Sequence, residues 1–339
     1  MSGRHAAGSA VPPDGPKVVA LGGGHGLAAS LQALRRVTPH LTAVVTVADD
    51  GGSSGRLREE LGILPPGDLR MALAALAGDD EWGRSWETLL QHRFGGSGPL
   101  AGHAVGNLVL AGLTESTGNP VEALDLTGRL VGAVGRVLPM SCSPLEIVAE
   151  VLGLDPDDPG RAQSVVGQVA VATTTGTVAA VHLRPAEPAA CDEAVQAVRD
   201  ADWVVLGPGS WFTSVLPHLL VPGLREALVA TSARRLVCLN LAAQAGETDG
   251  FSPEAHLDVL AGHAPDLRID VVLADEAAVG DAHGLMATVA GTGGRLVLAP
   301  VARNDGTPRH DPDRLAEALG GVLIDTPAGS ATPEARAWR

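Results

Sequence analysis

Residues 17–56 read KVVALGGGHGLAASLQALRRVTPHLTAVVTVADDGGSSGR, and they decide the fold. Two apolar runs, residues 17–21 and 41–47, each end in a glycine-rich loop that leads into a helix-like segment. This order predicts strand, loop, helix, strand, loop, helix, which is the pattern of βαβ units. Because the carboxyl ends of parallel strands meet at one edge of a sheet, we expect the loops after the strands to carry the function.

The remaining chain continues this pattern around a helical segment. Residues 65–150 are helix-like with frequent glycine, and residues 167–173 and 177–183 flank a short turn and predict a hairpin. Strands are expected at 203–206, 236–239, 269–274 and 295–299, and helices at 192–199, 253–261 and 313–319. We predict an α/β fold, a Rossmann-like, mostly parallel sheet with helices on both faces and a helical insertion. It forms a single domain over residues 17–325, between tails at 1–16 and 326–339.

The composition excludes several classes of protein. The chain has 339 residues and a formal net charge of −15, so no broad basic face for nucleic acid is expected. Lys17 is the only lysine, which excludes a lysine-containing phosphate loop and a Ser-x-x-Lys acyl enzyme. Tyrosine is absent and Phe and Trp are few, which disfavours base-stacking platforms.

The sequence also predicts the compartment. The first 17 residues lack the apolar core of a signal peptide, and the uncharged stretch 204–224 contains three prolines that would break a membrane-spanning helix. Cys142, Cys191 and Cys238 are odd in number and widely spaced, which favours buried thiols in a reducing compartment over a zinc site. We expect a soluble cytoplasmic protein with no membrane span.

The first loop combines four glycines with one histidine: Gly22, Gly23, Gly24, His25 and Gly26. A small-residue loop between a strand and a helix lets backbone N–H groups approach a phosphate at the positive end of the helix. Residues 24–29 also match GxGxxA, with Asp49 about 20 residues onward, so a nicotinamide dinucleotide is an alternative ligand. A tight turn without a ligand is the remaining interpretation.

The second loop places two carboxylates, Asp49 and Asp50, before the hydroxyls of Ser53 and Ser54. Hard oxygen ligands of this kind suit Mg²⁺ held together with a phosphate, so both aspartates are candidate magnesium ligands. Alternatively, Asp50 or Ser54 only caps a helix. Residues 51–55 also satisfy the GxSxG pattern of a serine hydrolase, although adjacent acidic residues would oppose a developing oxyanion.

Two later loops add polar groups to the same predicted edge. The third loop offers backbone and hydroxyl groups to a phosphate, from Gly207, Pro208, Gly209, Ser210, Thr213 and Ser214. In the fourth loop, Asn240 and Gln244 could read amide or sugar groups. The alternative is a set of solvated turns with Trp211 and Phe212 packed in the core.

Two further clusters are weaker candidates. His103 and Asn107 are four residues apart and would share one helix face that points into a cleft, although such a histidine is more often structural. Arg303 and Arg309, the latter beside His310 and Asp311, could supply a guanidinium fork to a diphosphate, or could be ordinary surface charge.

The joint pattern over residues 17–320 resembles one family. In order along the chain stand LGGGHGL, TVADDGGSSGRLREELGILPPGDLR, HRF, GHAVGN, VLGPGSWFTSVLPHLLVPG, NLAAQAGETDGFSP and DGTPRHDP. Together they resemble the YvcK family, also called the gluconeogenesis factor family, which is related to the CofD phospholactate transferases.

This resemblance implies a Rossmann-like cytoplasmic protein that binds UDP-N-acetylglucosamine or a related UDP-sugar. It also implies a role in cell shape and cell-wall synthesis during gluconeogenic growth. The CofD branch uses Mg²⁺ and matches the region of Asp49 and Asp50. The resemblance places residues 22–26 and 207–210, Thr213 and Asn240 around the nucleotide, and matches Arg309 to an arginine implicated in UDP-sugar binding.

The chain departs from the family pattern at several positions. His25 replaces a threonine in the first loop, Trp211 and Phe212 replace Leu-Tyr, and Met71 replaces an asparagine. A tyrosine that some members use for the ligand has no counterpart here. These changes leave the phosphate cradle intact and bear on sugar selectivity.

Our hypothesis from the sequence is a UDP-sugar-binding regulator whose ligand is neutralised by backbone amides, Arg309 and Mg²⁺. The alternative is a Mg²⁺-dependent transferase of CofD type. Mg²⁺ is the expected cofactor, with no covalent group. The expected partners are the UDP-sugar, cell-wall synthesis proteins, a Ser/Thr kinase and further copies of the chain.

Overall fold

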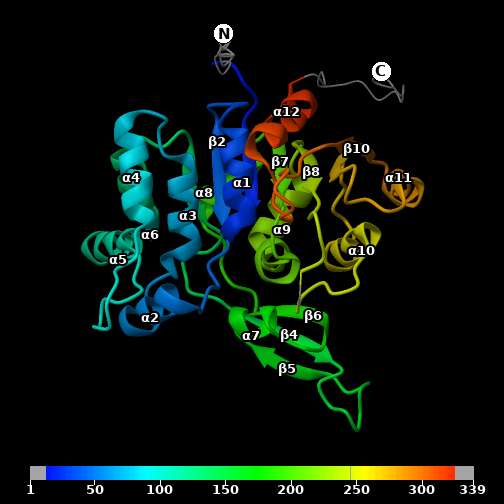
Figure 1. Cartoon of the computed structure of the whole chain (residues 1–339), viewed down its shortest axis with the longest axis horizontal. Coiled ribbons are helices and arrows are strands. Elements are labelled where there is room, and N and C mark those ends of the chain that lie inside the picture. Colours follow the sequence, from blue (N-terminus) through cyan, green and yellow to red (C-terminus); the bar gives the residue numbers. More distant parts are fainter. Residues whose placement is uncertain (1–12, 245, 325–339) are drawn as a thin grey trace.

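The main body of the protein is a seven-stranded parallel sheet covered by helices (Figure 1). The computed structural model describes residues 13–244 and 246–324. Its parallel strands are β1 (Val18–Gly22), β2 (Leu41–Val45), β3 (Arg136–Pro139), β7 (Trp203–Leu206), β8 (Arg234–Cys238), β9 (Val271–Asp275) and β10 (Arg295–Ala299). Strands β1, β7 and β9 are buried along their whole length, which explains their continuous apolar sequences.

The strand order is β10-β9-β8-β7-β1-β2-β3, so the chain builds outward from β1 on one side and from β7 on the other. Val18 of β1 pairs with Leu41 of β2 and with Trp203 of β7. The order therefore reverses between β1 and β7. In open α/β sheets, ligands bind at such a switch point, beyond the carboxyl ends of the strands.

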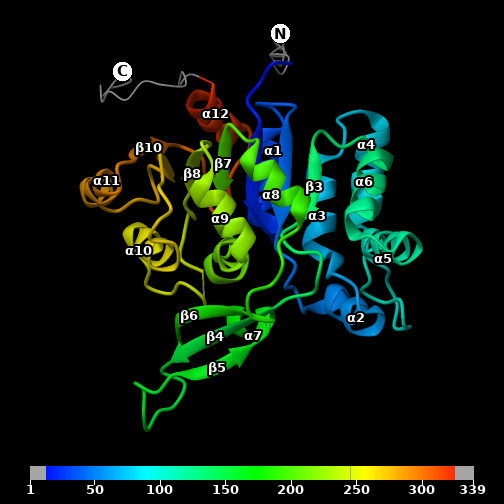
Figure 2. The same cartoon turned by 180° about the vertical axis from the view of Figure 1, so that it is seen from behind.

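Helices cover both faces of the sheet, as predicted. Helices α1, α3 and α12 lie over one face, and the reverse view shows α8 and α9 over the other (Figures 1 and 2). The helices are α1 (Gly24–Leu34), α2 (Gly52–Leu61), α3 (Pro66–Leu76), α4 (Glu81–Gln91), α5 (Val105–Thr117), α6 (Pro120–Leu130), α7 (Gln168–Ala172), α8 (Asp192–Arg199), α9 (Pro222–Ala230), α10 (Pro253–His263), α11 (Ala282–Gly291) and α12 (Pro312–Leu323), with a π-helical turn η1 (Trp211–Val215) and a 3₁₀ turn η2 (Leu216–Leu220). Within the described part of the chain, no helix is long and apolar enough to cross a membrane.

The predicted helical segment at 65–150 is helical only as far as Leu130. Helices α3 to α6 occupy its first part, and β3 then joins the main sheet beside β2. The prediction missed β3 because this edge strand is only four residues long and begins with the exposed Arg136.

The predicted hairpin of residues 167–173 and 177–183 is wrong. Residues 168–172 form α7, and β6 (Thr177–Arg184) pairs instead with β4 (Glu146–Leu152). Together with β5 (Gln163–Val166) they form a three-stranded antiparallel sheet of order β5-β4-β6, which projects from the main body (Figures 1 and 2). Of the predicted tails at 1–16 and 326–339, residues 1–12 and 326–339 lie outside the described residues.

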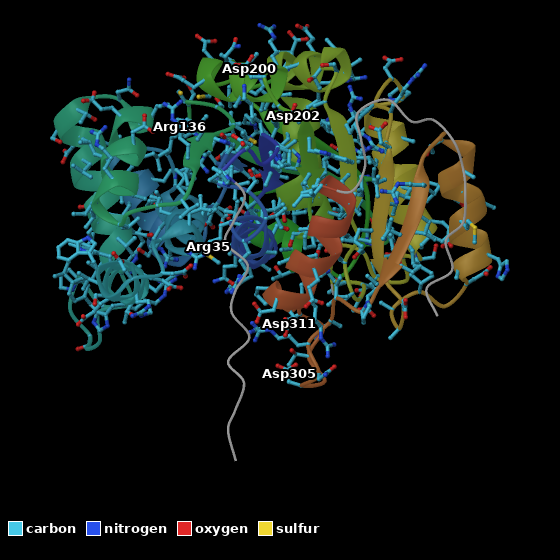
Figure 3. All side chains as sticks on the ribbon, turned by 90° about the horizontal axis from the view of Figure 1, so that it is seen from above. Arg35, Arg136, Asp200, Asp202, Asp305 and Asp311 are labelled. Atoms are coloured by element: carbon cyan, nitrogen blue, oxygen red, sulfur yellow. The ribbon has the colours of Figure 1, made fainter. Side chains whose placement is uncertain are left out.

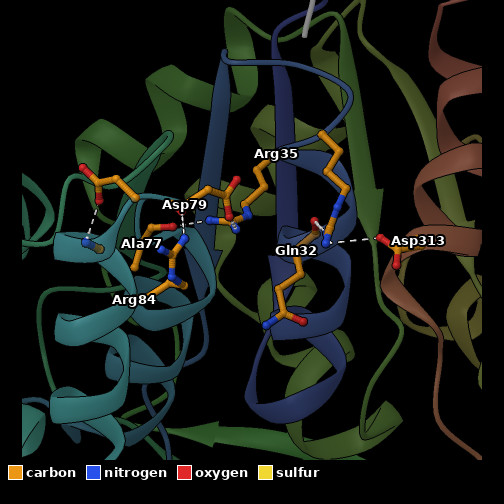
Figure 4. Close-up of polar contacts among 9 residues, drawn as sticks. Gln32, Arg35, Ala77, Asp79, Arg84 and Asp313 are labelled. Atoms are coloured by element: carbon orange, nitrogen blue, oxygen red, sulfur yellow. Dashed lines mark hydrogen bonds and ion pairs between the residues drawn. The ribbon is translucent and has the colours of Figure 1, made fainter. Parts of the chain in front are cut away.

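Ion pairs hold helix α1 to its two neighbours on the same face of the sheet (Figure 4). Arg35 contacts the Asp79 carboxylate and the Ala77 carbonyl, both in the link between α3 and α4. On the other side, Arg36 lies 3.2 Å from Asp313 of α12. The helix that follows the first glycine-rich loop is thus fixed at its carboxyl end.

Further polar contacts gather at the amino end of the sheet, which Figure 3 views from above. The Lys17 N–H donates to Asp202 Oδ2 at 2.8 Å, and Arg136 makes a two-pronged bond to Asp125 at 2.8 and 2.7 Å. These contacts belong to the scaffold, because the loops predicted to carry function lie at the opposite edge.

Candidate functional site

The first, third and fourth loops meet at the carboxyl edge of β1, β7 and β8. A Cβ atom on Gly26 would lie 2.3 Å from the Pro208 carbonyl oxygen, so only glycine permits this approach. The Gly209 N–H donates to Asn240 Oδ1 at 2.9 Å, and Asn240 Nδ2 donates back to the Gly209 carbonyl at 2.8 Å. The three loops therefore form one continuous wall, as the sequence predicted.

This wall encloses a cavity of about 590 Å³, within the size range of small-molecule sites. Its lining combines four arginines and several amide side chains with small and apolar residues, among them Leu241, Ala242 and Ala243 of the fourth loop. Its lining residues are His25, Gly26, Ala28, Ala29, Gln32, Arg70, Met71, Gln91, Arg93, Pro208, Gly209, Asn240, Leu241, Ala242, Ala243, Gln244, Arg303, Pro308, Arg309, His310 and Pro312.

Four arginines, Arg70, Arg93, Arg303 and Arg309, line this cavity in a chain that is acidic overall. Arg70 is the most constrained, because its Nε donates to Asn107 Oδ1 at 2.9 Å and its guanidinium also contacts Gln91. Burial lowers the pKa of Arg70 to about 10, so the side chain stays protonated near neutral pH. The cavity is thus built for an anionic ligand.

Two neutral side chains complete the wall. Burial lowers the pKa of His310 to about 4, so its imidazole is uncharged near neutral pH. Gln244 Nε2 donates to Ser210 Oγ at 3.3 Å, whereas Gln244 Oε1 is buried without a hydrogen-bond partner among the described residues. An unsatisfied acceptor at a cavity wall is costly unless a ligand N–H or O–H occupies it.

The Asp68 carboxylate of α3 lies at the amino end of α1. Helix α1 begins at Gly24, whose φ of +57° favours glycine, and its backbone N–H bonds to Asp68 of α3. A Cβ atom on Gly23 would lie 2.5 Å from Asp68 Oδ2. Burial raises the pKa of Asp68 to about 7, and the nearby Asp49 carboxylate adds to the rise. Within the predicted phosphate loop, only His25 and Gly26 face the large cavity.

A smaller cavity of about 270 Å³ adjoins the large one. Arg70, Met71 and Arg93 line both, so these three side chains stand at the boundary between them. The lining of the smaller cavity is acidic and hydroxylic on its far side, with Asp49, Gly51, Gly52, Ser53, Ser54, Gly67 and Asp68.

The two adjacent aspartates of the second loop have different surroundings. Asp49 lines the smaller cavity, and its Oδ1 accepts a hydrogen bond from the Gly51 N–H at 2.9 Å. Asp50 instead accepts from the Val169 N–H of α7 at 2.9 Å, which ties the second loop to the small sheet. The carboxylate that shares the smaller cavity with Asp49 is Asp68.

Ser53, His103 and Asn107 form one buried hydrogen-bond network. Asn107 Nδ2 donates to Ser53 Oγ at 2.9 Å, and Ser53 Oγ lies 3.0 Å from His103 Nδ1. Burial lowers the pKa of His103, which favours its neutral ring. A neutral imidazole nitrogen can accept a hydrogen bond from the serine hydroxyl. Because Asn107 Oδ1 also holds Arg70, the network positions a cavity arginine. The Ser53–His103 contact is equally the one that a serine nucleophile and its base would make.

The hydroxyl-bearing part of the third loop turns inward. Thr213 Oγ1 donates to Glu247 Oε1 at 2.5 Å, and the Phe212 N–H donates to Glu247 Oε2 at 3.2 Å. Burial raises the pKa of Glu247, and its hydrogen bonds oppose that rise. Trp211 and Phe212 are fully buried, as the alternative interpretation of this loop predicted. Glu247 thus holds η1 in place.

The predicted site residues fall into three groups. Those at the large cavity are His25, Gly26, Pro208, Gly209, Asn240, Gln244 and Arg309. Those at the smaller cavity are Asp49, Ser53 and Ser54. Those outside both linings are Gly22, Gly23, Gly24, Asp50, Asn107, Gly207, Ser210, Thr213 and Ser214, several of which support lining residues. Sequence reasoning missed Asp68, Arg70, Arg93 and Glu247. The available signal for the first two was DLR, residues 68–70, at the end of the second motif quoted for the family resemblance.

Comparisons with known proteins identify relatives along most of the chain. The family model described as "2-phospho-L-lactate transferase CofD" matches residues 18–288. A protein of Mycobacterium tuberculosis strain H37Rv, named "Putative gluconeogenesis factor", is 57% identical over 321 residues, covering 94% of this chain and 93% of the relative. A protein of Halalkalibacterium halodurans, named "Gluconeogenesis factor", is 36% identical over 319 residues, covering 89% and 95%.

A solved structure has the same fold. The crystal structure of a UPF0052 family member from Bacillus halodurans superposes with a TM-score of 0.79 at 33% sequence identity, covering 91% of this chain and 99% of that one. The agreement extends over nearly the whole relative, so the large sheet and the small sheet belong to one shared architecture.

Proposed function

The chain belongs to the CofD family, among the relatives named gluconeogenesis factor, and from this premise we propose that it is a regulatory protein that binds a UDP-sugar. UDP-N-acetylglucosamine is the expected ligand. The single observation that carries the proposal is the set of four arginines that line a cavity of about 590 Å³ at the switch point of the sheet.

The four arginines would hold the diphosphate of the ligand. A diphosphate bridge carries two negative charges, and planar guanidinium groups bind phosphate oxygens through paired hydrogen bonds. Lysine is unavailable for this role, because the only lysine, Lys17, precedes β1 at the opposite edge of the sheet. The charges for the ligand therefore come from Arg70, Arg93, Arg303 and Arg309.

The uracil or the acetamido group of the ligand would satisfy Gln244. Both groups present an N–H donor, and Gln244 Oε1 is the buried acceptor that lacks a partner among the described residues. His25 and Met71, two positions where the chain departs from the family pattern, line the same cavity. We therefore expect the sugar preference to depend on these two residues.

We propose that Mg²⁺ assists binding through Asp49 and Asp68 at the smaller cavity. No group of three His, Cys, Asp or Glu side chains that could hold a metal occurs in residues 13–244 and 246–324. Two carboxylates nevertheless suffice for Mg²⁺ when ligand phosphate oxygens and water complete its coordination. When bound, the ion would neutralise phosphate charge beside Arg70 and Arg93.

We propose a regulatory role in the cytoplasm, in cell shape and cell-wall synthesis during gluconeogenic growth, rather than turnover. The resemblance described above supports this role, because a part in cell shape and cell-wall synthesis is what it implies. A Mg²⁺-dependent transferase of CofD type is the alternative, and the same two cavities would serve it.

The test is calorimetric titration of the full chain, with and without Mg²⁺, using UDP-N-acetylglucosamine, UMP and NAD. We expect tight binding of the UDP-sugar only. Arg309→Ala should weaken it at least about tenfold, the size of one charged hydrogen bond. Arg161→Ala removes an exposed arginine in the β4–β5 loop and should leave binding unchanged. Release of UDP or UMP during incubation would favour the transferase, and failure to bind any UDP-sugar would reject the proposal.

A further inference from the structure

The small sheet is connected to the main body by two linkers that lie side by side. Residues 140–145 lead from β3 into β4, and residues 185–191 lead from β6 into α8. The Cys191 N–H donates to the Met140 carbonyl at 3.1 Å, which joins the linkers where they leave the main body. Each linker carries one cysteine, Cys142 in the first and Cys191 in the second.

The two thiols differ in accessibility. A turn in which the Ser143 N–H donates to Ser141 Oγ at 3.2 Å presents Cys142 to solvent. Cys191 is buried, and its thiol donates to Glu193 Oε2 at 3.2 Å. One thiol is therefore open to a small reagent, and the other is shielded behind it.

The thiols of Cys142 and Cys191 lie on adjacent linkers and influence each other. Each is the largest influence on the pKa of the other, which is lowered for Cys142 and raised for Cys191. A disulfide requires Cα atoms within roughly 7 Å. The backbone bond from the Cys191 N–H to Met140, two residues before Cys142, holds the two chain segments side by side. An exposed thiol of lowered pKa next to a second thiol is the usual arrangement of a peroxide-reactive pair.

We propose that Cys142 and Cys191 form a reversible disulfide when the protein reacts with hydrogen peroxide. The Cys142 thiolate attacks one peroxide oxygen, the O–O bond breaks, and hydroxide leaves and takes up a proton to become water. The Cys191 thiol then attacks the resulting sulfenic sulfur, so the S–S bond forms and a second water leaves. Two thiols are oxidised and one hydrogen peroxide is reduced to two waters. A small-molecule dithiol reverses the reaction by exchange.

The disulfide would close the whole small sheet into one covalent loop. That loop contains β4, β5, α7 and β6, and α7 holds the second glycine-rich loop through the bond from the Val169 N–H to Asp50. Cross-linking restricts the open states of a segment more strongly than its native state. Oxidation should therefore suppress local opening of the small sheet next to the smaller cavity.

The test is treatment of the full chain with hydrogen peroxide near one equivalent, followed by alkylation and peptide mass mapping. We expect loss of two hydrogens and a Cys142–Cys191 cross-linked peptide, which dithiothreitol removes. Cys142→Ser and Cys191→Ser should yield no intramolecular cross-link. Cys238→Ala is the matched control and should behave as the unmodified chain, because burial raises the pKa of the Cys238 thiol to about 12.

Amide hydrogen exchange gives a second readout. It is measured on the unmodified chain, so it does not depend on whether the cysteine variants fold. Oxidation should slow amide exchange across β4, β5 and β6 at least threefold, and dithiothreitol should restore the original rates. The proposal is overturned if peroxide carries Cys142 to sulfinic acid while Cys191 stays a free thiol, or if Cys142 links two chains. It is also overturned if the cross-link forms without any change in exchange.

Discussion

Asn240 and Gly209 exchange two hydrogen bonds, one in each direction, across the carboxyl edge of the sheet. The side chain of Asn240 thereby acts as a brace for the third loop, with one N–H and one lone pair of its amide engaged. The sequence predicted Asn240 as a ligand-binding residue. Its two bonds lead us to expect that it acts by fixing the wall of the cavity.

Asn240→Ala should therefore weaken UDP-sugar binding indirectly. Loss of both bonds leaves backbone groups of Gly209 unpaired, which we expect to cost about 1–3 kcal/mol of folding stability. Urea unfolding measures this cost, and titration measures the affinity, which should fall about tenfold. Asn240→Asp keeps the acceptor but sets a carboxylate against the Gly209 carbonyl and beside the anionic ligand, so its affinity should fall at least as far as that of the alanine variant. Unchanged affinity in the alanine variant would contradict the bracing role.

Asp49 and Asp50 provide a matched pair for the metal proposal. Asp49→Asn should abolish the increase in UDP-sugar affinity that Mg²⁺ gives, because this carboxylate lines the smaller cavity. Asp50→Asn should retain the Mg²⁺ effect and loosen the small sheet instead, because it holds the Val169 N–H. Titrations with and without Mg²⁺ decide between them. Equal behaviour of the two variants would refute the assignment to Asp49.

Gly26→Ala tests the close contact between the first and third loops. The new methyl group would lie 2.3 Å from the Pro208 carbonyl oxygen, so backbone must move and ligand binding should be lost together with roughly 1–3 kcal/mol of stability. Gly112→Ala in α5 is the control, since nothing lies within 4 Å of its added methyl group. That change should raise the melting temperature slightly, because alanine favours helix over glycine. A tolerant Gly26→Ala variant would mean that the loops are further apart.

His218 should make the protein sensitive to acid. It is fully buried between the carbonyl oxygens of Val44 and Val215, and burial lowers its pKa from 6.5 to about 4. As pH falls below 6.5, the unfolded chain takes up this proton first. Stability is therefore intact above pH 6.5 and is lost progressively toward pH 4, by roughly 3 kcal/mol for this group.

Urea unfolding at pH 7, 5.5 and 4.5 measures this loss. His218→Gln should flatten the dependence on pH while lowering stability at pH 7, whereas His310 contributes to the slope in both proteins because its pKa is also near 4. An unchanged slope in His218→Gln would show that another group governs the acid transition.

The sequence was most informative where structure is local. The strands β1, β2, β7 and β9 follow directly from short β-branched runs that end in glycine or aspartate, and the loop positions follow from the parallel order of these strands. The error at residues 167–173 has a tertiary cause. Gly167 adopts a φ of +101°, and Asp50, more than a hundred residues earlier, holds the start of α7.

The residues that sequence reasoning missed depend on long-range packing. Asp68 and Arg70 sit in a helix whose sequence pattern reflects only its burial, and they reach the site because α3 packs against α1. Glu247 likewise acts on Thr213, 34 positions earlier, and no local pattern connects the two. The fold was therefore accessible from periodicity, whereas the charge balance of the site required the tertiary structure.

The most direct measurement is a crystal structure of the full chain with UDP-N-acetylglucosamine. We expect the diphosphate in the large cavity within hydrogen-bonding distance of Arg309 and of at least one of Arg70, Arg93 and Arg303, and a ligand N–H at Gln244 Oε1. A ligand bound elsewhere on the molecule, or a diphosphate that contacts none of these arginines, would contradict the account.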